Sequence, residues 1–339
     1  MPTLKTESEA EWLAVREHHV GGSEIAALFY VWRTPDGGEV TRHLFEAPDE
    51  GDICLGCLSP YTTGYRLWHE KAGRLKPKDF GNERIDAGTH LEPAIARWAG
   101  DKWDWKIRRV KRYFQHGSAP GWGASLDYEV HEKGSSGQPV EIKNVDGLIF
   151  RDQWSGDDDR VYDMPMHIHL QLQHQIGAVG AEVGHVVCCV AGNDLKRGIF
   201  EVHKPTQARI AEAVSQFWHS VAEGVSPDWL ADFDTVADVW SVGPPGDKKA
   251  APVDMSDDEY LAREVRRLER WKAHQKFVEG QVEMIKGRVG ARIGERYKIV
   301  TPDYRITWPT ITRPAKMVPG YWMDEKTYRG GMTVTRLKK

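Results

Sequence analysis

The spacing of hydrophobic residues changes along this chain, and the change predicts where helices give way to strands. In the first hundred residues apolar side chains recur every three or four positions, the period of an amphipathic helix. This pattern predicts helices in the first forty residues, across 62–74, and from about Thr89 to residue 103. A Gly-Gly-Ser break divides the first of these regions, with Ser23 as the N-cap of its second helix. Residues 34–58 are rich in Gly, Asp and Pro and predict a long loop.

From residue 105 the hydrophobic period is two, as in a strand with one buried face. Two helical segments, 166–180 and 206–224, interrupt and follow the strands. The predicted strands are 107–114, 123–131, 138–144, 184–190 and 198–203, with a hairpin turn at "KGSSGQ" (133–138). This order of elements predicts an α+β fold with a central mixed sheet flanked by helices.

The last hundred residues have a different character. The segment "SVGPPGDKKAAP" (241–252) has the composition of a linker. A long charged helix with an imperfect apolar stripe follows at about 256–295, and strand-like segments close the chain around "YKIVTPDYRITW" and "MTVTRLKK". The sequence therefore predicts a first domain at 1–240 and a C-terminal extension, with a long helix and short strands, at 253–339.

Composition narrows the class of protein. With 46 Lys and Arg against 50 Asp and Glu there is no global positive charge, so any nucleic acid would bind through local patches. No apolar run approaches the roughly 18 residues that a membrane span needs, and "MPTLKTESEAEW" lacks the pattern of a signal peptide. Four cysteines are too few for a disulfide scaffold. We therefore expect a cytoplasmic protein.

The segment "GQPVEIKN" predicts a strand that carries both signs of charge on one face, because Glu141 and Lys143 alternate with apolar residues. A hairpin with 123–131 would place Asp127 beside Glu141. Burying two unpaired carboxylates would cost several kcal/mol, and a hard divalent cation removes most of that penalty. The arrangement predicts a Mg²⁺ site, where Lys143 holds or deprotonates a metal-bound water or offsets charge on a scissile phosphate.

The same residues also suit an ordinary surface strand, in which Glu141 and Lys143 pair with neighbouring side chains. Asp127, fourteen residues earlier and across a Gly-rich turn, makes the metal site the stronger of the two interpretations. The choice between them depends on the surrounding motifs.

Asp127 followed by the Glu141-x-Lys143 triplet resembles the PD-(D/E)XK nuclease signature, with Leu126 in place of the usual proline. More specifically, the chain resembles the YqaJ-like viral recombinases, the group that includes lambda exonuclease. Over about residues 10–230 the resemblance is carried, in order, by "W-x3-R" before "GGSEIA", "SPYTTGYRLWHEKAGR", "GTHLEP" and "QLQHQIGAVG". It implies a restriction-endonuclease-like α/β/α core.

The resemblance also implies roles for residues of the site. Asp127 and Glu141 would be metal ligands, joined by the backbone carbonyl oxygen of Ile142, and Lys143 would be the catalytic lysine. Glu92, in "HLEP", would assist the metal through water or bind a second ion, so that the site holds two Mg²⁺ ions, for which Mn²⁺ can substitute.

Three further residues match the family pattern. Gln171 would orient the substrate or Lys143, since the apolar stripe of its helix is flanked by Gln171 and Gln175 while Gln173 points elsewhere. Arg16 and Ser23 match the pair that grips the phosphate at the 5′ end of a DNA strand. Taken alone, Ser23 at a helix N-terminus is equally explained as a plain N-cap.

The function implied is that of a Mg²⁺-dependent 5′-to-3′ exonuclease acting on double-stranded DNA ends. Such an enzyme, encoded by a phage or prophage and working in the bacterial cytoplasm, would supply 3′ overhangs to a phage single-strand annealing protein of the RecT or Red beta type, and would form a homotrimer around DNA. The alternatives are a structure-specific or other endonuclease on the same core, and a DNA-binding or assembly module that has lost catalysis. The presence of Asp127, Glu141 and Lys143 together argues against the last of these.

Some positions depart from the family pattern. Glu24 stands where aspartate is usual after Gly-Ser, and Asn144 follows the lysine where a small residue is common. The segment 30–52 and the "CLGC" after it, with Cys54 and Cys57, lie outside the pattern.

Other features allow other interpretations. Cys54 and Cys57 form half of a zinc site at most. His167 and His169 would point about 200° apart on a helix, which disfavours a shared metal. The basic segment "KWDWKIRRVKRY" (102–113) and the basic residues of the C-terminal helix suit either a phosphate backbone or a solvated face.

Overall fold

The computed structural model describes residues 3–5, 9–77, 81, 83–131, 137–241, 253–313, 316–318, 321–323, 326–329 and 333–336. It divides into two compact units, Met1–Pro245 and Gly246–Lys339. Residues 242–252 of the expected linker and most of the "KGSSGQ" turn lie outside the described residues. No helix in these ranges is long and apolar enough to cross a membrane.

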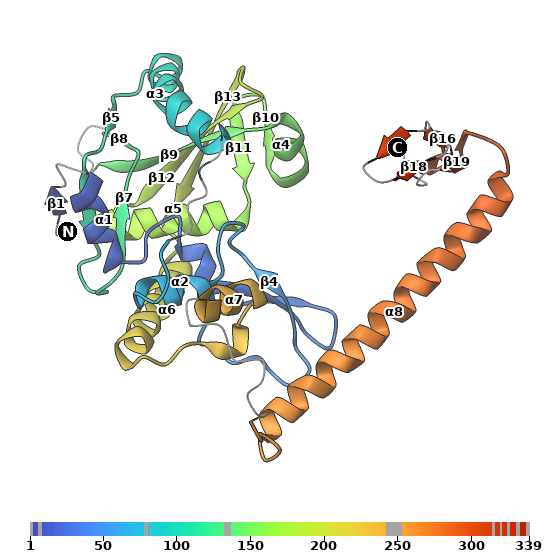
Figure 1. Ribbon diagram of the computed structural model, residues 1–339. Helices are drawn as coiled ribbons and strands as arrows, with labels where there is room; N and C mark the ends of the chain where they lie inside the picture. The colour runs from blue at the N-terminus through green and yellow to red at the C-terminus, as the bar shows by residue number, and fades with distance from the viewer. Residues whose placement is uncertain are drawn as a thin grey trace. The chain divides into compact units, whose positions relative to one another are not determined.

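A mixed seven-stranded sheet forms the centre of the first unit (Figure 1). In spatial order its strands are β10 (Ser155–Asp157), β11 (Arg160–Asp163), β13 (Asp194–Glu201), β12 (Val183–Val190), β9 (Gln138–Val145), β8 (Tyr128–Val130) and β5 (Ile107–Arg109). The pairs β9–β12 and β11–β13 are parallel, and the other neighbours are antiparallel. β9 and β12 therefore lie in the interior of the sheet, covered on both faces.

Two helices cover opposite faces of this sheet, α5 (Met166–Val179) and α3 (Glu83–Trp103) (Figure 1). Leu172 and Ile176 of α5 pack in one buried cluster with Val186 of β12. Ile95 and Ala99 of α3 belong to a second cluster on the other face. The predicted α+β fold, with a mixed sheet between helices, is confirmed.

The α5 helix approaches the sheet closely at one glycine. A Cβ atom placed on Gly184 of β12 would lie 2.8 Å from both Ile176 Cγ1 and Leu172 Cδ1. Real Cβ atoms do not come so near to other carbon atoms, so any side chain at this position would force the helix or its side chains to shift.

The remaining helices of the first unit surround this core. They are α1 (Glu9–Glu17), the 3₁₀ turn η1 (Ile25–Leu28), α2 (Gly64–Lys71), α4 (Gly147–Gln153), α6 (Lys204–Glu223), the 3₁₀ turn η2 (Asp228–Leu230) and α7 (Phe233–Ser241). The helices predicted at 166–180 and 206–224 agree with α5 and α6, because each has a full apolar stripe and a glycine at its C-terminus.

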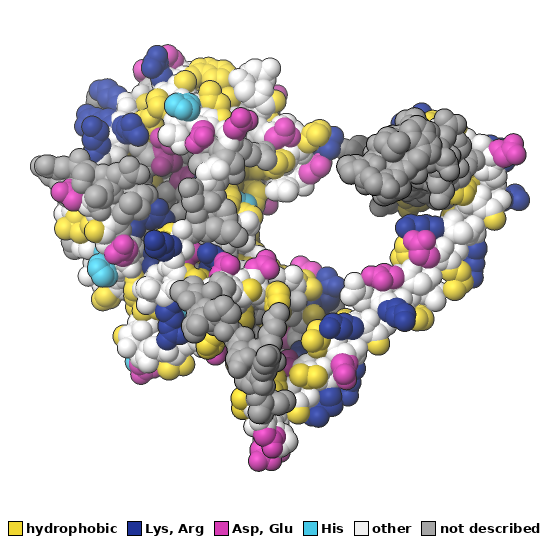
Figure 2. All heavy atoms as spheres, in the orientation of Figure 1, with side chains coloured by type: hydrophobic (Ala, Val, Ile, Leu, Met, Phe, Trp, Pro, Cys, Tyr) yellow, Lys and Arg dark blue, Asp and Glu magenta, His cyan; other side chains and the backbone are white. Residues whose placement is uncertain are grey.

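The second unit contains the long helix α8 (Glu259–Ile293), a three-stranded antiparallel sheet and two antiparallel strand pairs. Asp258 caps the helix by accepting a hydrogen bond from the Leu261 amide, and Gly294 ends it. In Figure 2 hydrophobic and charged side chains alternate along its surface. The strands are β14 (Lys298–Val300), β15 (Tyr304–Thr307), β16 (Thr310–Arg313), β17 (Lys316–Val318), β18 (Tyr321–Met323), β19 (Lys326–Arg329) and β20 (Thr333–Arg336).

The expected second helix and long loop before residue 58 are wrong. After η1 the chain forms β2 (Phe29–Arg33), which pairs with β3 (Glu39–His43) and β4 (Ile53–Cys57). The run Phe-Tyr-Val-Trp-Arg favours a strand once two partners lie beside it.

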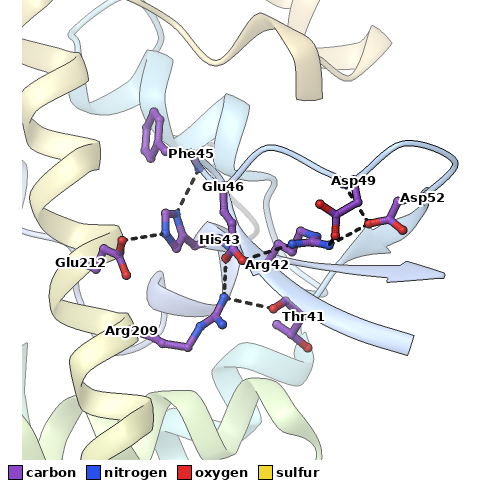
Figure 3. A network of polar contacts seen from close by, with 9 residues as sticks. All are labelled: Thr41, Arg42, His43, Phe45, Glu46, Asp49, Asp52, Arg209 and Glu212. Carbon is purple, nitrogen blue, oxygen red and sulfur yellow. Dashed lines mark hydrogen bonds and ion pairs between the residues drawn. The ribbon is translucent and has the colours of Figure 1, made fainter. Parts of the chain in front are cut away.

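Polar contacts fasten the β3–β4 region to α6 (Figure 3). Arg42 pairs with Asp49 and Asp52, and Arg209 of α6 binds Glu46. These contacts order a segment and attach it to α6, although its Gly, Asp and Pro content had suggested a loop.

The strands expected at 107–114 and 123–131 are each divided between two sheets. The beginning of the first and the end of the second are β5 and β8 of the central sheet. The other parts, β6 (Arg112–Gln115) and β7 (Gly123–Ser125), form a separate sheet with β1 (Thr3–Lys5). Both strands bend at the same level, where the Val110 amide donates to the carbonyl of Asp127. Asp127 therefore lies at the bend.

Candidate active site

A buried carboxylate lies at the centre of the site. Glu141 of β9 is 2% exposed and accepts hydrogen bonds at both oxygen atoms. Lys143 Nζ lies 2.6 Å and Gln171 Nε2 2.7 Å from Glu141 Oε1, and Gln175 Nε2 lies 2.6 Å from Oε2. Lys143 Nζ also reaches Gln171 Oε1 at 3.4 Å. These contacts fix the orientation of the carboxylate.

Two periodicities explain this cluster. Residues 141 and 143 are two apart on β9, so both side chains leave the same face of the sheet. Gln171 and Gln175 are four apart on α5 and lie on one side of the helix. Gln173 points elsewhere, donating to the Glu201 carbonyl at 2.8 Å and accepting from the His203 amide. The predicted orientation of the three glutamines is confirmed.

The structure brings Asp127 to Glu141 through the pairing of β8 with β9, in which Tyr128 lies opposite Val140. Burial, followed by the charges of Glu141 and Glu92, raises the pKa of Asp127 from 3.8 to about 8. Lys143 and a backbone hydrogen bond from Ile142 oppose this rise only in part. The site thus holds more acidic groups than its own cations can keep ionised at neutral pH.

Glu92 approaches this group from α3. The helix begins at Glu83, earlier than the expected start near Thr89, and contains Pro93 in its interior. Burial raises the pKa of Glu92, and Glu141 raises it further, against the opposing charge of Arg109. Glu92 is therefore an electrostatic neighbour of the central carboxylate.

In the free protein Glu141 stabilises the charged form of the lysine of the site. Burial alone would lower the pKa of Lys143, but the charge and hydrogen bond of Glu141 outweigh it and raise this pKa above its ordinary value. A protonated ammonium group can hold a water molecule or offset phosphate charge, but it cannot accept a proton.

The chemistry of the donor set fits a hard divalent cation. A buried carboxylate whose pKa is raised by other carboxylates would be relieved by a bound cation. In the described part of the chain, however, no three His, Cys, Asp or Glu side chains are arranged to hold a metal ion.

The predicted N-cap role of Ser23 is wrong. The residue that precedes η1 is Glu24, and its side chain makes no capping bond to the four-residue turn. Its carboxylate instead binds Arg16 at 2.8 Å, Lys71 at 3.0 Å and the Gly21 amide at 2.8 Å. Ser23 itself is exposed in the turn. We refer to Arg16, Glu24 and Lys71 as the Glu24 cluster.

The glycine turn next to this cluster lies against the site. A Cβ atom on Gly22 would be 3.4 Å from Gln171 Cγ and 3.6 Å from Gln175 Cγ. The structure therefore brings the segment that contains Ser23 to the two glutamines that hold Glu141.

Two aromatic residues near Lys143 were not predicted. Tyr61, 60% exposed, packs edge-on against His167, with ring centroids 6.1 Å apart. Burial, and then the charge of Lys143, lower the pKa of His167. His167 lies four residues before Gln171, so its place on the glutamine side of α5 was accessible from the sequence.

The alternative metal sites receive no support. Cys57 points its thiol at backbone carbonyls, and burial raises its pKa to about 11. His169 binds Asp163 at 2.7 Å, away from His167. Part of the basic segment is paired within the protein, as Arg112 is with Glu129.

Comparison with known proteins gives one family match and several similar solved structures. Residues 39–182 match the model of the YqaJ-like viral recombinase domain. Two crystal structures of an alkaline exonuclease (LHK-Exo) from Laribacter hongkongensis, one of them in complex with dAMP, are similar to this chain at 17% sequence identity and a TM-score of 0.45. The match covers 64% of this chain and 94% of that chain. A phage-related exonuclease from Haemophilus somnus 129PT has 9% identity and a TM-score of 0.39 over 62% of this chain and 97% of that chain. No curated protein matches the chain.

The matched region includes Glu92, Asp127, Glu141, Lys143 and Gln171 but begins after Arg16 and Ser23. The segment that builds the site is thus the part of the chain, residues 39–182, that matches the YqaJ-like viral recombinase domain.

Proposed function

We propose that this protein is a Mg²⁺-dependent exonuclease that degrades one strand of duplex DNA from its 5′ end. The observation that carries the proposal is the buried Glu141 carboxylate, oriented by Lys143, Gln171 and Gln175 beside Asp127. Its position within a YqaJ-like viral recombinase domain supports a role in DNA processing.

Asp127, Glu141 and the carbonyl oxygen of Ile142 would hold the metal. Glu92 would act through a water molecule or a second ion. When bound, Mg²⁺ or Mn²⁺ would stabilise charge on the phosphate oxygens and lower the pKa of a bound water. The raised pKa of Asp127 keeps this group largely protonated in the free protein, and a bound cation would favour its ionised form.

The protein's own groups position the reactants. Lys143 is protonated and would donate a hydrogen bond to the attacking water or to a phosphate oxygen. Gln171 and Gln175 hold Glu141 in one rotamer, so that the carboxylate need not reorganise when substrate binds. Tyr61 is exposed beside Lys143 and would contact the terminal nucleotide.

The 5′ polarity rests on the Glu24 cluster. Arg16 and Lys71 both bind the Glu24 carboxylate, so two cationic groups lie together beside the glycine turn. The adjoining turn lies against Gln171 and Gln175. A terminal phosphate bound by Arg16 and Ser23 would thus lie close to the hydrolytic site, and the enzyme would select 5′-phosphorylated ends.

The products would be mononucleotides and duplexes with 3′ single-stranded overhangs. Such overhangs are the substrate of a single-strand annealing protein. A phage or prophage enzyme of this kind would work in the bacterial cytoplasm beside that protein.

The test uses linear duplex DNA labelled at its 5′ or its 3′ end, with Mg²⁺ or with EDTA. Wild type is compared with Glu141→Ala and Lys143→Ala, and with Glu201→Ala and Lys204→Ala, which remove the same charges outside the site. We expect 5′ mononucleotides from wild type and the two controls only, and none with EDTA.

Two results would contradict the proposal. Intact linear ends together with cleavage of circular or branched DNA would indicate an endonuclease. DNA binding without any cleavage would indicate a module that has lost catalysis.

A further inference from the structure

The long helix α8 exposes a row of apolar side chains. We define the α8 stripe as Leu261, Leu268, Trp271, Val278, Val282, Ile285 and Val289. Those from Leu261 to Ile285 are 42–58% exposed. A helix face that stays in contact with water would carry polar residues at these positions.

The spacing of the α8 stripe indicates what kind of surface covers it. From residue 268 to residue 289 the positions on this side of the helix follow one another in alternating steps of three and four residues. Gln275 occupies the one position in this series that is polar, and all the others belong to the α8 stripe. A strict period of 3.5 keeps a seam straight only when two helices supercoil around each other. The stripe therefore suits another long helix rather than a flat sheet or a lipid surface.

We propose that α8 pairs with α8 of a second copy of this chain as an antiparallel coiled coil. A second copy always supplies a helix of matching length, about 50 Å at 1.5 Å per residue. Within one chain α8 is supported by pairs such as Arg267–Glu264 and Lys286–Glu283 on its own surface. Such pairs stabilise a single helix only slightly.

Size complementarity favours the antiparallel register centred between Gln275 and Val278. Trp271 of each copy then lies opposite Val282 of the other, and Leu268 lies opposite Ile285. Large residues facing smaller ones fill a seam without voids or overlap. A parallel pair would instead place the two Trp271 rings in one layer.

Charge at the seam agrees with this register. The antiparallel pair brings Lys272 of each copy beside Glu279 of the other, twice by symmetry. In a parallel pair Lys272 would lie beside Arg267, with like charge. The antiparallel register brings Arg267 near Arg288, but only at the ends of the contact, where these long side chains extend into water.

The first test measures the mass of the full-length protein in solution by light scattering. Val282→Asp puts a charge into the seam, and Met284→Asp puts the same charge on the opposite side of α8 at a similarly exposed residue, 47% against 43%. We expect Val282→Asp to halve the mass, from dimer to monomer or, where the first unit also forms the homotrimer that the family resemblance implies, from hexamer to trimer. Met284→Asp should leave the mass unchanged. An unchanged mass for Val282→Asp overturns the proposal, and a threefold fall would indicate a three-stranded bundle instead.

The second test addresses orientation. Lys272→Glu should weaken the association about tenfold, because two attractive pairs become repulsive, and Lys272→Glu with Glu279→Lys should restore it. Tighter association of Lys272→Glu alone would show the parallel pair and overturn the register. Glu141→Ala should leave the mass unchanged, so the result is independent of the proposed nuclease activity.

Discussion

Two regions of the first unit bury acidic side chains, and they do so with opposite balances of charge. In the Glu24 cluster one carboxylate meets two cations, Arg16 and Lys71. Burial alone would raise the pKa of Glu24, but Lys71 and Arg16 together lower it below its ordinary value. In the sheet site, burial and two neighbouring carboxylates raise the pKa of Asp127 to about 8.

The difference separates a carboxylate that is paired within the fold from carboxylates whose proposed partner is a bound cation. A buried acid that is fully paired contributes to stability. A buried acid whose pKa is raised by other acids lowers the stability of the free protein, and such groups persist where they serve a function. Variants at the two regions should therefore have opposite effects on activity and on stability.

The largest effect is expected for Glu141→Gln. Losing the charge that would bind the metal should lower the rate of duplex hydrolysis about 10³-fold or more, while the amide keeps the size of the side chain. Glu24→Gln should retain most of the rate at saturating DNA. Comparable activity in the two variants would remove the distinction between the regions.

Lysine substitutions should differ in the kinetic parameter that they change. Lys143→Ala should lower kcat about 10²-fold to 10³-fold, since it removes a charge at the reacting phosphate. Lys71→Ala should raise KM for 5′-phosphorylated duplex ends about tenfold and change kcat little. Steady-state kinetics on ends with and without the phosphate separate the two, and a kcat effect at Lys71 would argue against the assignment.

Stability should fall when Glu24 loses its charge. Glu24→Gln leaves Arg16 and Lys71 without their shared partner, and we expect a loss of about 3 kcal/mol at neutral pH in urea unfolding. Because the pKa of Glu24 is lowered in the folded protein, its contribution is complete above the ordinary value of 4.5 and disappears as the pH falls. The difference between variant and wild type should therefore shrink toward pH 3.

Asp127→Asn should have a smaller effect of the opposite sign. The pKa of Asp127 is raised in the folded protein, so wild type loses stability as the pH rises from about 4 to about 8. In EDTA at pH 8 the variant should be more stable than wild type by about 1–2 kcal/mol, and the gain should vanish near pH 4. A variant that is less stable at pH 8 would show that Asp127 is paired after all.

The sequence allowed the strand of Glu141 and Lys143 and the glutamine helix to be predicted because both are governed by local periodicity. Glu141 and Lys143 share a strand face, and Gln171 shares a helix side with Gln175. Residues 29–33 carry no clear period, and their strand exists because β3 and β4 lie beside it.

Other features depend on contacts between distant residues. The Glu24 cluster joins Arg16 to Lys71, 55 residues away, and no local pattern predicts such a pair. The bend at Asp127 is likewise set by the division of two strands between two sheets.

The close packing at Gly184 makes the site sensitive to a residue with no side chain. Helix α5 lies so near β12 that a methyl group there would overlap Ile176 and Leu172. Displacing the helix by even half an ångström would lengthen hydrogen bonds of 2.6–2.7 Å between its glutamines and Glu141. The protein therefore tolerates little change at this glycine, and the geometry of its candidate site depends in part on the spacing between helix and sheet in its core.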